Sequence, residues 1–445
     1  MSSNPLAFLG GPGPSRPGPV RPQAAAKTVS RARAWWPGVP LDNHANSLNL
    51  LRLVFAATVI VAHSFYTGGF GHGPMPGGYN VGGWAVGGFF IISGYLITAS
   101  RNSHKLGGFL ARRIARIYPA FVVNLLIVAL VLSPINYHWA HHSLKHFWTT
   151  ATTPLMYVFG NLRLQLVSYN VAGTPLKVPY PSAWNGSMWT LWYEFTCYLI
   201  IGIGLTFTCL RRFQKTFVVV VFLLSIAANW HPAHLATYFG AGSYLPQLLQ
   251  LTPWFFGGAI LYEFRSKLRY NFPCAVLCAA AGTALIAWRP APEWGTFLSA
   301  PLWGYVIMWL AMVLPMPKII GTQDISYGIY IYGFPVQQVL AMAHVQSHGY
   351  FPYMLASLLC TIPCAIASWV IVEKPAMAWV RERKAYPRLH HDATPSRHLR
   401  PQPLPATPPR PTGADTPAPA PDQSPAPHRG SDGPPPAAPG TKVAQ

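Results

Sequence analysis

Long apolar runs dominate the middle of this 445-residue chain and constrain its fold more than any other feature. Most of them approach the roughly 20 residues that a helix needs to cross a bilayer. In lipid such a run must be helical, because only a helix satisfies its own backbone hydrogen bonds. The runs lie near residues 47–67, 81–100, 117–135, 188–209, 216–230, 243–262, 272–288, 296–314, 326–343 and 351–372. The sequence therefore predicts an all-α polytopic membrane protein with about ten transmembrane helices.

Charged residues are scarce, and most of them are basic. They make up 10% of the chain, whereas soluble domains carry about 25%. The 32 Lys and Arg against 11 Asp and Glu give a formal net charge of +21. A basic chain can indicate nucleic acid as a partner, but such proteins are not depleted in charge overall. We therefore exclude an ordinary soluble enzyme and expect membrane lipids, not nucleic acid, as partners.

The basic residues alternate between loops, and this alternation predicts the orientation. Lys and Arg populate the N-terminal arm and follow the second, fourth, sixth, eighth and tenth runs. Residues 68–80, 231–242 and 344–350, in the opposite loops, contain none. Because cytoplasmic loops carry the excess of Lys and Arg, we expect both termini in the cytoplasm.

The two ends of the chain differ in composition from the apolar middle. Residues 1–43 are basic and rich in Gly and Pro, and they lack the apolar run of a cleavable signal peptide. Residues 381–445 are first basic and then rich in Pro and Ala. Such a composition buries too little apolar surface to offset its ordering entropy. We expect disordered ends around a membrane domain of residues 44–380.

Cysteine and histidine give no sign of a metal site. The six cysteines lie in apolar runs, where they behave as small hydrophobic residues, and no partner follows at zinc spacing. A histidine cluster in an outer loop can in principle take a metal but matches no specific site. Its members are His138, His141, His142 and His146. No metal ion is predicted.

Among the few acidic residues, Glu194 alone lies inside an apolar run, in SMWTLWYEFTCYL. The other acidic residues sit at helix ends, in loops or in the tail region. Burying a charged side chain inside the membrane costs several kcal/mol, so a charged residue found there is by default a candidate functional residue. Glu194 is therefore a candidate site residue by elimination.

The first apolar run supplies a candidate partner for Glu194. Arg52 and His63 are eleven positions apart, which is about three helical turns plus 20°, so both project from one face. The rise of about 16 Å places Arg52 near the cytoplasmic end and His63 toward the outer half. The run that contains Glu194 enters the membrane from the outside, and Glu194 lies a few residues into it, so His63 and Glu194 can lie at the same depth in the membrane. Such a pair suits general-base catalysis, or it merely ties two helices together.

Two further motifs have alternative interpretations. The loop FLARRIARIYP places Arg112 and Arg116 on one helix face, where they can clamp a phosphorylated ligand or serve as topology anchors and lipid contacts. In the second run Ser93 offers a hydroxyl inside the bundle, unless it bonds to its own helix. Gly94 and neighbouring glycines permit a close helix approach.

These residues fall in motifs that resemble those of the acyltransferase-3 family, multi-pass membrane O-acyltransferases that modify glycans and lipid-linked sugars. The matches run in family order and span roughly residues 47–376. They comprise Arg52 with His63, the segment 89–97, the basic motif Arg112, Arg113, Arg116, Ile117 and Pro119, and the segments 186–194, 325–336 and 372–375.

The resemblance implies a ten-helix domain in a bacterial inner membrane, acting with polysaccharide-biosynthesis machinery. It implies acyl-CoA, most often acetyl-CoA, as donor and a sugar hydroxyl of a carbohydrate or glycolipid as acceptor. It also implies that His63 is the catalytic histidine and that Glu194 lies in the site. The residues expected on the donor side are Arg52, Arg112, Arg113, Arg116 and Ser93. Those expected to contact the acceptor are Trp189, Tyr193 and Asn185.

Three departures from the family pattern matter. Asn49 and Leu50 replace the usual Asp-Gly, so an acidic contact to Arg52 is expected to be missing. Gly333 stands where many members carry a histidine, which argues that a second histidine is not needed. The Pro-rich tail has no Gly-Asp-Ser block, so the appended hydrolase domain of some members is not expected.

The expected chemistry has two mechanistic forms and one main rival. His63 either deprotonates the acceptor hydroxyl or carries the acyl group transiently. The rival is a transporter or flippase of lipid-linked sugars that uses His63 and Glu194 as a proton relay. Transporters commonly show repeat symmetry, whereas the signature residues here concentrate in the first four runs, which favours an enzyme. A signalling or scaffolding protein does not explain the basic motif together with the buried His63 and Glu194.

Overall fold

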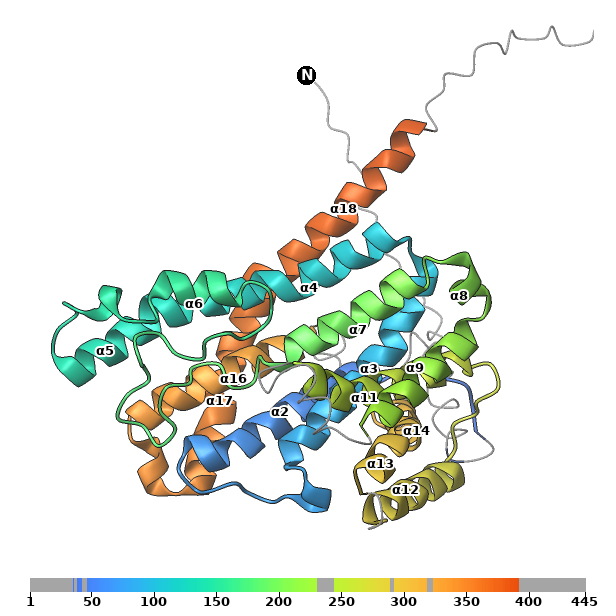
Figure 1. Ribbon diagram of the computed structural model, residues 1–445, viewed down its shortest axis with the longest axis horizontal. Coiled ribbons are helices and arrows are strands. Elements are labelled where there is room, and N and C mark those ends of the chain that lie inside the picture. The colour runs from blue at the N-terminus through green and yellow to red at the C-terminus, as the bar shows by residue number, and fades with distance from the viewer. Residues whose placement is uncertain are drawn as a thin grey trace, which may run out of the picture. The chain divides into compact units, whose positions relative to one another are not determined.

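The structure is a computed structural model that describes residues 35, 38–41, 46–229, 244–288, 292–317 and 323–391. In this part of the chain every extended regular element is a helix, and pairing of the β type is limited to isolated bridges such as Val39 with Tyr270. The predicted all-α class is therefore confirmed for the described residues (Figure 1).

Each of the predicted apolar runs coincides with a helix. The first five correspond to α2 (Leu48–Thr67), α3 (Val81–Ser103), α4 (Leu106–Ile127) with its continuations η2 (Val128–Leu132) and α5 (Ser133–His141), α7 (Thr190–Gly204) and α9 (Gln214–Ala228). The last five correspond to α11 (Leu245–Glu263), α12 (Phe272–Ala287), α13 and α14 (Pro292–Leu298, Ala300–Val313), α16 (Ser326–Met342), and α17 with η5 (Tyr350–Ser368, Trp369–Glu373). The other described α-helices are α6 (Pro154–Asn161), α8 (Thr208–Arg212) and α18 (Lys374–His391).

Four of these helical stretches are long and apolar enough to cross a membrane. They are Leu48–Thr67, Val81–Ser103, Leu106–His141 and Tyr350–Glu382. Shorter apolar helices span Gln214–Ala228, Phe272–Ala287 and Ala300–Val313. The structure thus supports a helical membrane protein by length and composition.

The third helix starts earlier than the sequence predicted. Its apolar part was expected from residue 117, with the preceding arginines in a loop, but α4 begins at Leu106 and carries the arginines within its first turns. Leu, Ala and Arg are strong helix formers, so the polar segment extends the helix instead of ending it. The π-helical stretch Val128–Leu132 continues it toward His141.

The ends of the domain also differ from expectation. Val39 exchanges backbone hydrogen bonds with Tyr270, and Trp35 packs on Phe272 and Trp309, so these arm residues are part of the domain. α18 passes through the expected boundary at residue 380 and ends at His391. The disorder expected for 1–34 and 392–445 lies outside the described residues.

Helices α3 and α11 approach each other closely enough for backbone contact. A Cβ atom on Gly94 would overlap the carbonyl of Phe255, and one on Gly258 would overlap the carbonyl of Ile91. Small residues permit such crossings in membrane proteins, so the close approach predicted at Gly94 is confirmed. Around this pair, α7 contacts both helices and α16 packs against α2 and α17 (Figure 1). The candidate site lies among α2, α3, α4, α7 and α16.

Candidate functional site

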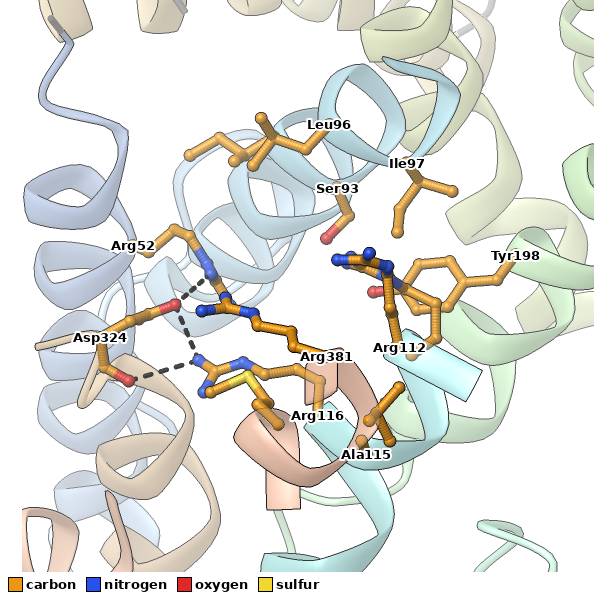
Figure 2. Close-up of a pocket in the computed structure, with 14 residues that line it drawn as sticks. Arg52, Ser93, Leu96, Ile97, Arg112, Ala115, Arg116, Tyr198, Asp324 and Arg381 are labelled. Carbon is orange, nitrogen blue, oxygen red and sulfur yellow. Dashed lines mark hydrogen bonds and ion pairs between the residues drawn. The ribbon is translucent and has the colours of Figure 1, made fainter. Parts of the chain in front are cut away.

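A cavity of about 220 Å³ gathers the arginines that the sequence singled out. We call it the arginine cavity, and Figure 2 shows side chains from α2, α3, α4, α7 and α18 converging on it. Its polar lining residues are Arg52, Ser93, Arg112, Arg113, Arg116, Tyr198, Asp324 and Arg381. Positive charge dominates this lining, with Asp324 as its acidic member.

Two of these arginines are neutralised by carboxylates, of which Glu373 is fully buried and Asp324 is partly buried. Asp324 lies 2.6 Å from Arg52 and 2.7 Å from Arg116, and Arg116 also pairs with Glu373 at 2.6 Å (Figure 2 shows the Asp324 contacts). The Glu373 side chain is fully buried and accepts a hydrogen bond from Ser368. The acidic contact to Arg52 that was expected to be missing is therefore present, and that expectation was wrong, because Asp324 supplies it from a distant part of the chain.

Asp324 precedes α16 and remains ionised in this arrangement. Burial alone would raise the pKa of its carboxyl, but the positive charges of Arg116 and Arg52 lower it to about 2. Ser326 adds a hydrogen bond from its hydroxyl to the carboxylate at 2.6 Å. Arg52, Asp324, Arg116 and Glu373 therefore form a charge-balanced network that joins α2, α4, α16 and η5.

The remaining arginines of the cavity are left as unpaired cations. In the described part of the chain, Arg112, Arg113 and Arg381 form no ion pair, and the Nε atoms of Arg112 and Arg113 are buried without a hydrogen-bond partner. Guanidinium groups in this state are suited to bind an anionic ligand.

Arg381 was missed as a site residue and counted only as a topology cation. Figure 2 shows it reaching into the cavity from α18. The signal was its spacing: Glu373, Met377, Val380 and Arg381 follow the i, i+4, i+7, i+8 pattern of one helix face, and the last three line the cavity.

Glu194 lies at the depth of Arg52 and away from His63. Its Oε1 atom accepts hydrogen bonds from Ser93 Oγ and from the Tyr198 hydroxyl, both at 2.5 Å. Glu194 lines a cavity of about 40 Å³ that also touches Arg52. No hydrogen bond or ion pair joins it to His63 among the described residues, so the expected pair is not formed.

The reason lies in the segment that leads into α7. Asn185, Ser187 and Met188 are already buried, with exposed fractions of 0%, 1% and 0%, so the chain is inside the bundle before the helix begins at Thr190. Glu194 is consequently deeper than a count from the end of the apolar run suggested.

His63 lines a separate cavity of about 330 Å³, which we call the His63 cavity. Tyr66, Trp189, Trp254 and Tyr330 also line it. The imidazole packs against the Tyr66 and Phe334 rings, each with centroids 5.2 Å away. No hydrogen bond from the imidazole is found in the described part of the chain, so its nitrogens remain available to a ligand.

A fourth cavity, of about 700 Å³, is lined by six aromatic side chains among its thirteen residues, and we call it the aromatic cavity. Trp189 and Tyr193, two expected acceptor contacts, line it. Asn185 does not, because its side-chain amide donates to the Tyr157 hydroxyl and is fully buried. The other lining residues are Gln165, Leu166, Tyr169, Tyr180, Pro181, Ser182, Ala183, Gly186, Trp192, Tyr244 and Gln247.

The cavities form a series that shares its walls. Arg52 lines both the arginine cavity and the small cavity of Glu194. Val86 and Tyr330 line both the small cavity and the His63 cavity. Trp189 lines both the His63 cavity and the aromatic cavity. The cationic cavity thus adjoins the small cavity of Glu194, which adjoins the His63 cavity and, beyond it, an uncharged aromatic cavity.

Comparison with known proteins gives a consistent result. The acyltransferase-3 family model, described as an acyltransferase domain, matches residues 45–373. An O-acetyl transferase of Shigella phage Sf6 is 28% identical over 339 residues, covering 74% of this chain and 95% of the relative. Nodulation protein 10 of Rhizobium leguminosarum bv. viciae is 27% identical over 358 residues, covering 76% and 94%. No solved structure matches.

Proposed function

Because the chain belongs to the acyltransferase-3 family, we propose that it transfers an acetyl group from acetyl-CoA to a hydroxyl of a carbohydrate or glycolipid. It is an integral membrane acyltransferase of the O-acetyltransferase type, as the family match, a relative's name and the apolar helices indicate. The donor, the acceptor and the roles of individual residues are the proposal. The observation that carries it is the series of cavities with the unpaired His63 between a cationic and an aromatic end.

Acyl-CoA is the donor that fits the arginine cavity. The phosphates of coenzyme A would bind Arg112, Arg113 and Arg381, which lack carboxylate partners in the described structure, whereas Arg52 and Arg116 hold the network of Asp324 and Glu373. At about 220 Å³ the cavity is smaller than the roughly 300–1,000 Å³ of ordinary ligand sites. It would therefore receive the diphosphate and the adjoining part of the pantetheine arm, with the adenosine outside and the thioester beyond it toward His63.

Ser93 and Glu194 would act on the donor side. Glu194 holds the hydroxyls of Ser93 and Tyr198, and all three side chains lie where the arginine cavity meets the small cavity of Glu194. There Glu194 would hold the Ser93 and Tyr198 side chains in place beside the path of the acyl group, and it would not orient His63 directly.

His63 would activate the acceptor. Its imidazole takes the proton of the acceptor hydroxyl as the oxygen attacks the thioester carbonyl, and returns a proton to the departing sulfur, so that an ester bond forms and the thioester bond breaks. General-base catalysis of this kind contributes about 10²–10⁴-fold. A relay, in which His63 carries the acyl group and then releases it to the acceptor, uses the same position.

The aromatic cavity would bind the carbohydrate. Aromatic side chains present apolar faces with polar edges, and Trp189, Trp192 and Tyr193 line it together with Gln165 and Gln247. Trp189 also lines the His63 cavity, so a sugar ring against this side chain can direct one hydroxyl toward the imidazole.

We further propose ten transmembrane helices with both termini in the cytoplasm of a bacterial inner membrane. The arginines of α4 then face the cytoplasm, where acyl-CoA is made, and the aromatic cavity faces the outer side. In that place the enzyme would act with polysaccharide-biosynthesis machinery. The rival interpretation as a flippase relied on a proton relay between His63 and Glu194, and no hydrogen bond or ion pair joins these side chains in the described structure.

The test is a transfer assay with purified protein and acetyl-CoA labelled in the acetyl group. The acceptor probe is the surface-glycan fraction extracted from cells that lack the gene. We expect the label to appear in the glycan as an alkali-labile ester with the wild type and to be absent with His63→Gln. A label that stays on coenzyme A with wild-type protein of normal size-exclusion behaviour would contradict the proposal.

A further inference from the structure

The narrowest point of the series lies between the arginine cavity and His63. The cavity there holds about 40 Å³, far less than the roughly 300–1,000 Å³ of ordinary ligand sites. It shares Arg52 with the arginine cavity, and Val86 and Tyr330 with the His63 cavity. An acyl group that moves from the arginine cavity to His63 must pass this constriction.

The apolar wall of the constriction is made of interlocked aromatic rings. The Phe89 ring lies edge-on to Tyr330, with centroids 5.8 Å apart, and edge-on to Phe55 at 5.9 Å. The Tyr330 hydroxyl donates to the backbone carbonyl of Ser187 and also bonds to the Thr190 hydroxyl. Both partners lie where the chain enters α7, so two hydrogen bonds anchor the Tyr330 hydroxyl to this segment.

The opposite wall is held equally firmly. Glu194 is fixed by Ser93 and Tyr198, and Arg52 is fixed by Asp324. Phe89 is half-buried and, as an apolar side chain, is held by packing alone, so it is the part of the aromatic wall that can yield. The width of the constriction is therefore set mainly by the Phe89 and Tyr330 rings on one side against Glu194 and Arg52 on the other.

Building on the proposed function, we propose that Phe89 and Tyr330 select the acyl chain that the enzyme transfers, admitting acetyl and excluding longer chains. Each added methylene must displace a ring from a close-packed wall. A pocket typically distinguishes one methylene by about 10- to 200-fold. For butyryl, with two more methylenes than acetyl, the expected discrimination is at least about 100-fold.

The experiment compares acetyl-CoA and butyryl-CoA, each labelled in the acyl group, with the same surface-glycan fraction as acceptor. For the wild type, we expect kcat/KM to favour acetyl by about 100-fold or more. Phe89→Ala should reduce this preference at least tenfold by speeding butyryl transfer. Phe89→Leu, a milder change that retains an apolar side chain, should move it in the same direction, and it keeps the test open should the alanine variant not fold.

The matched control is Phe65→Ala. Phe65 is also half-buried and also stacks on an aromatic ring, that of Tyr350 at 4.2 Å, but it lines none of the cavities described above. Its removal should leave the acetyl preference unchanged. Size-exclusion chromatography in detergent checks that each variant is folded.

The outcomes separate the two proposals. A wild type that transfers acetyl and butyryl equally well overturns the selection but leaves the proposed function standing. Phe89 variants that keep the wild-type preference, or a Phe65→Ala variant that loses it, also overturn the selection. A folded wild type that transfers neither group overturns the proposed function, and the selection falls with it.

Discussion

Replacing Arg113 with Gln is predicted to weaken acyl-CoA binding without destabilising the protein. The Arg113 guanidinium has no carboxylate partner in the described structure, and its Nε is buried without a hydrogen bond. A buried, unpaired cation carries a desolvation penalty, so its removal should leave the melting temperature unchanged or raise it. The same variant deletes a charge-assisted hydrogen bond to a donor phosphate.

The size of the effect follows from ordinary values for such bonds. A hydrogen bond to a charged group contributes about 1.5–3 kcal/mol, and 1.4 kcal/mol corresponds to about a tenfold change in affinity. KM for acetyl-CoA should therefore rise roughly 10- to 150-fold, while KM for the glycan stays the same. Arg112→Gln should behave similarly.

Arg116→Gln is the matched comparison. This arginine pairs with both Asp324 and Glu373. Its removal leaves the fully buried Glu373 carboxylate without an ion-pair partner, which typically costs about 3–5 kcal/mol. The variant should lose thermal stability in detergent, as measured by intrinsic fluorescence. The assignment of Arg113 to donor binding is refuted if Arg113→Gln has a normal KM for acetyl-CoA. The assignment of Arg116 to stability is refuted if Arg116→Gln melts at the temperature of the wild type.

Three other predictions concern separate parts of the molecule. Asp324→Asn should destabilise the protein by about 3–5 kcal/mol. Because the pKa of Asp324 is lowered from 3.8 to about 2, the stability that its carboxylate contributes is complete above about pH 4 and is lost as the pH falls toward 2. The melting temperature of the variant should therefore lack that part of the acid dependence. Trp189→Ala should raise KM for the glycan but not for acetyl-CoA, and a change confined to acetyl-CoA would contradict its place in the aromatic cavity. Gly94→Ala should lower the yield of monodisperse protein, because the added Cβ overlaps the Phe255 carbonyl; a normal yield would show that α3 and α11 are not so close.

The sequence predicted the helices well because apolar length is a local property. Each predicted run became a helix, and Gly94 was correctly expected at a close crossing. Boundaries were less certain where polar residues continue a helix, as at Leu106 of α4 and in α18 beyond residue 380. There, helix propensity outweighed the drop in hydrophobicity.

The site was predicted less completely because its contacts are long-range. Elimination identified Glu194 as buried, but its bonds to Ser93 and Tyr198 depend on how the segment before α7 enters the bundle. Asp324 and Glu373 were set aside as residues at helix ends. Only the folded chain shows that they lie against Arg116, 208 and 257 positions away in the chain.

The most direct test of the account is the mass of the surface glycans from cells that lack the gene and carry either the wild-type or the His63→Gln enzyme. The account predicts that the wild type restores an alkali-labile acetyl group and that His63→Gln, inserted in the membrane at the same level, does not. Glycans that are fully acetylated with His63→Gln would contradict the central role given to His63.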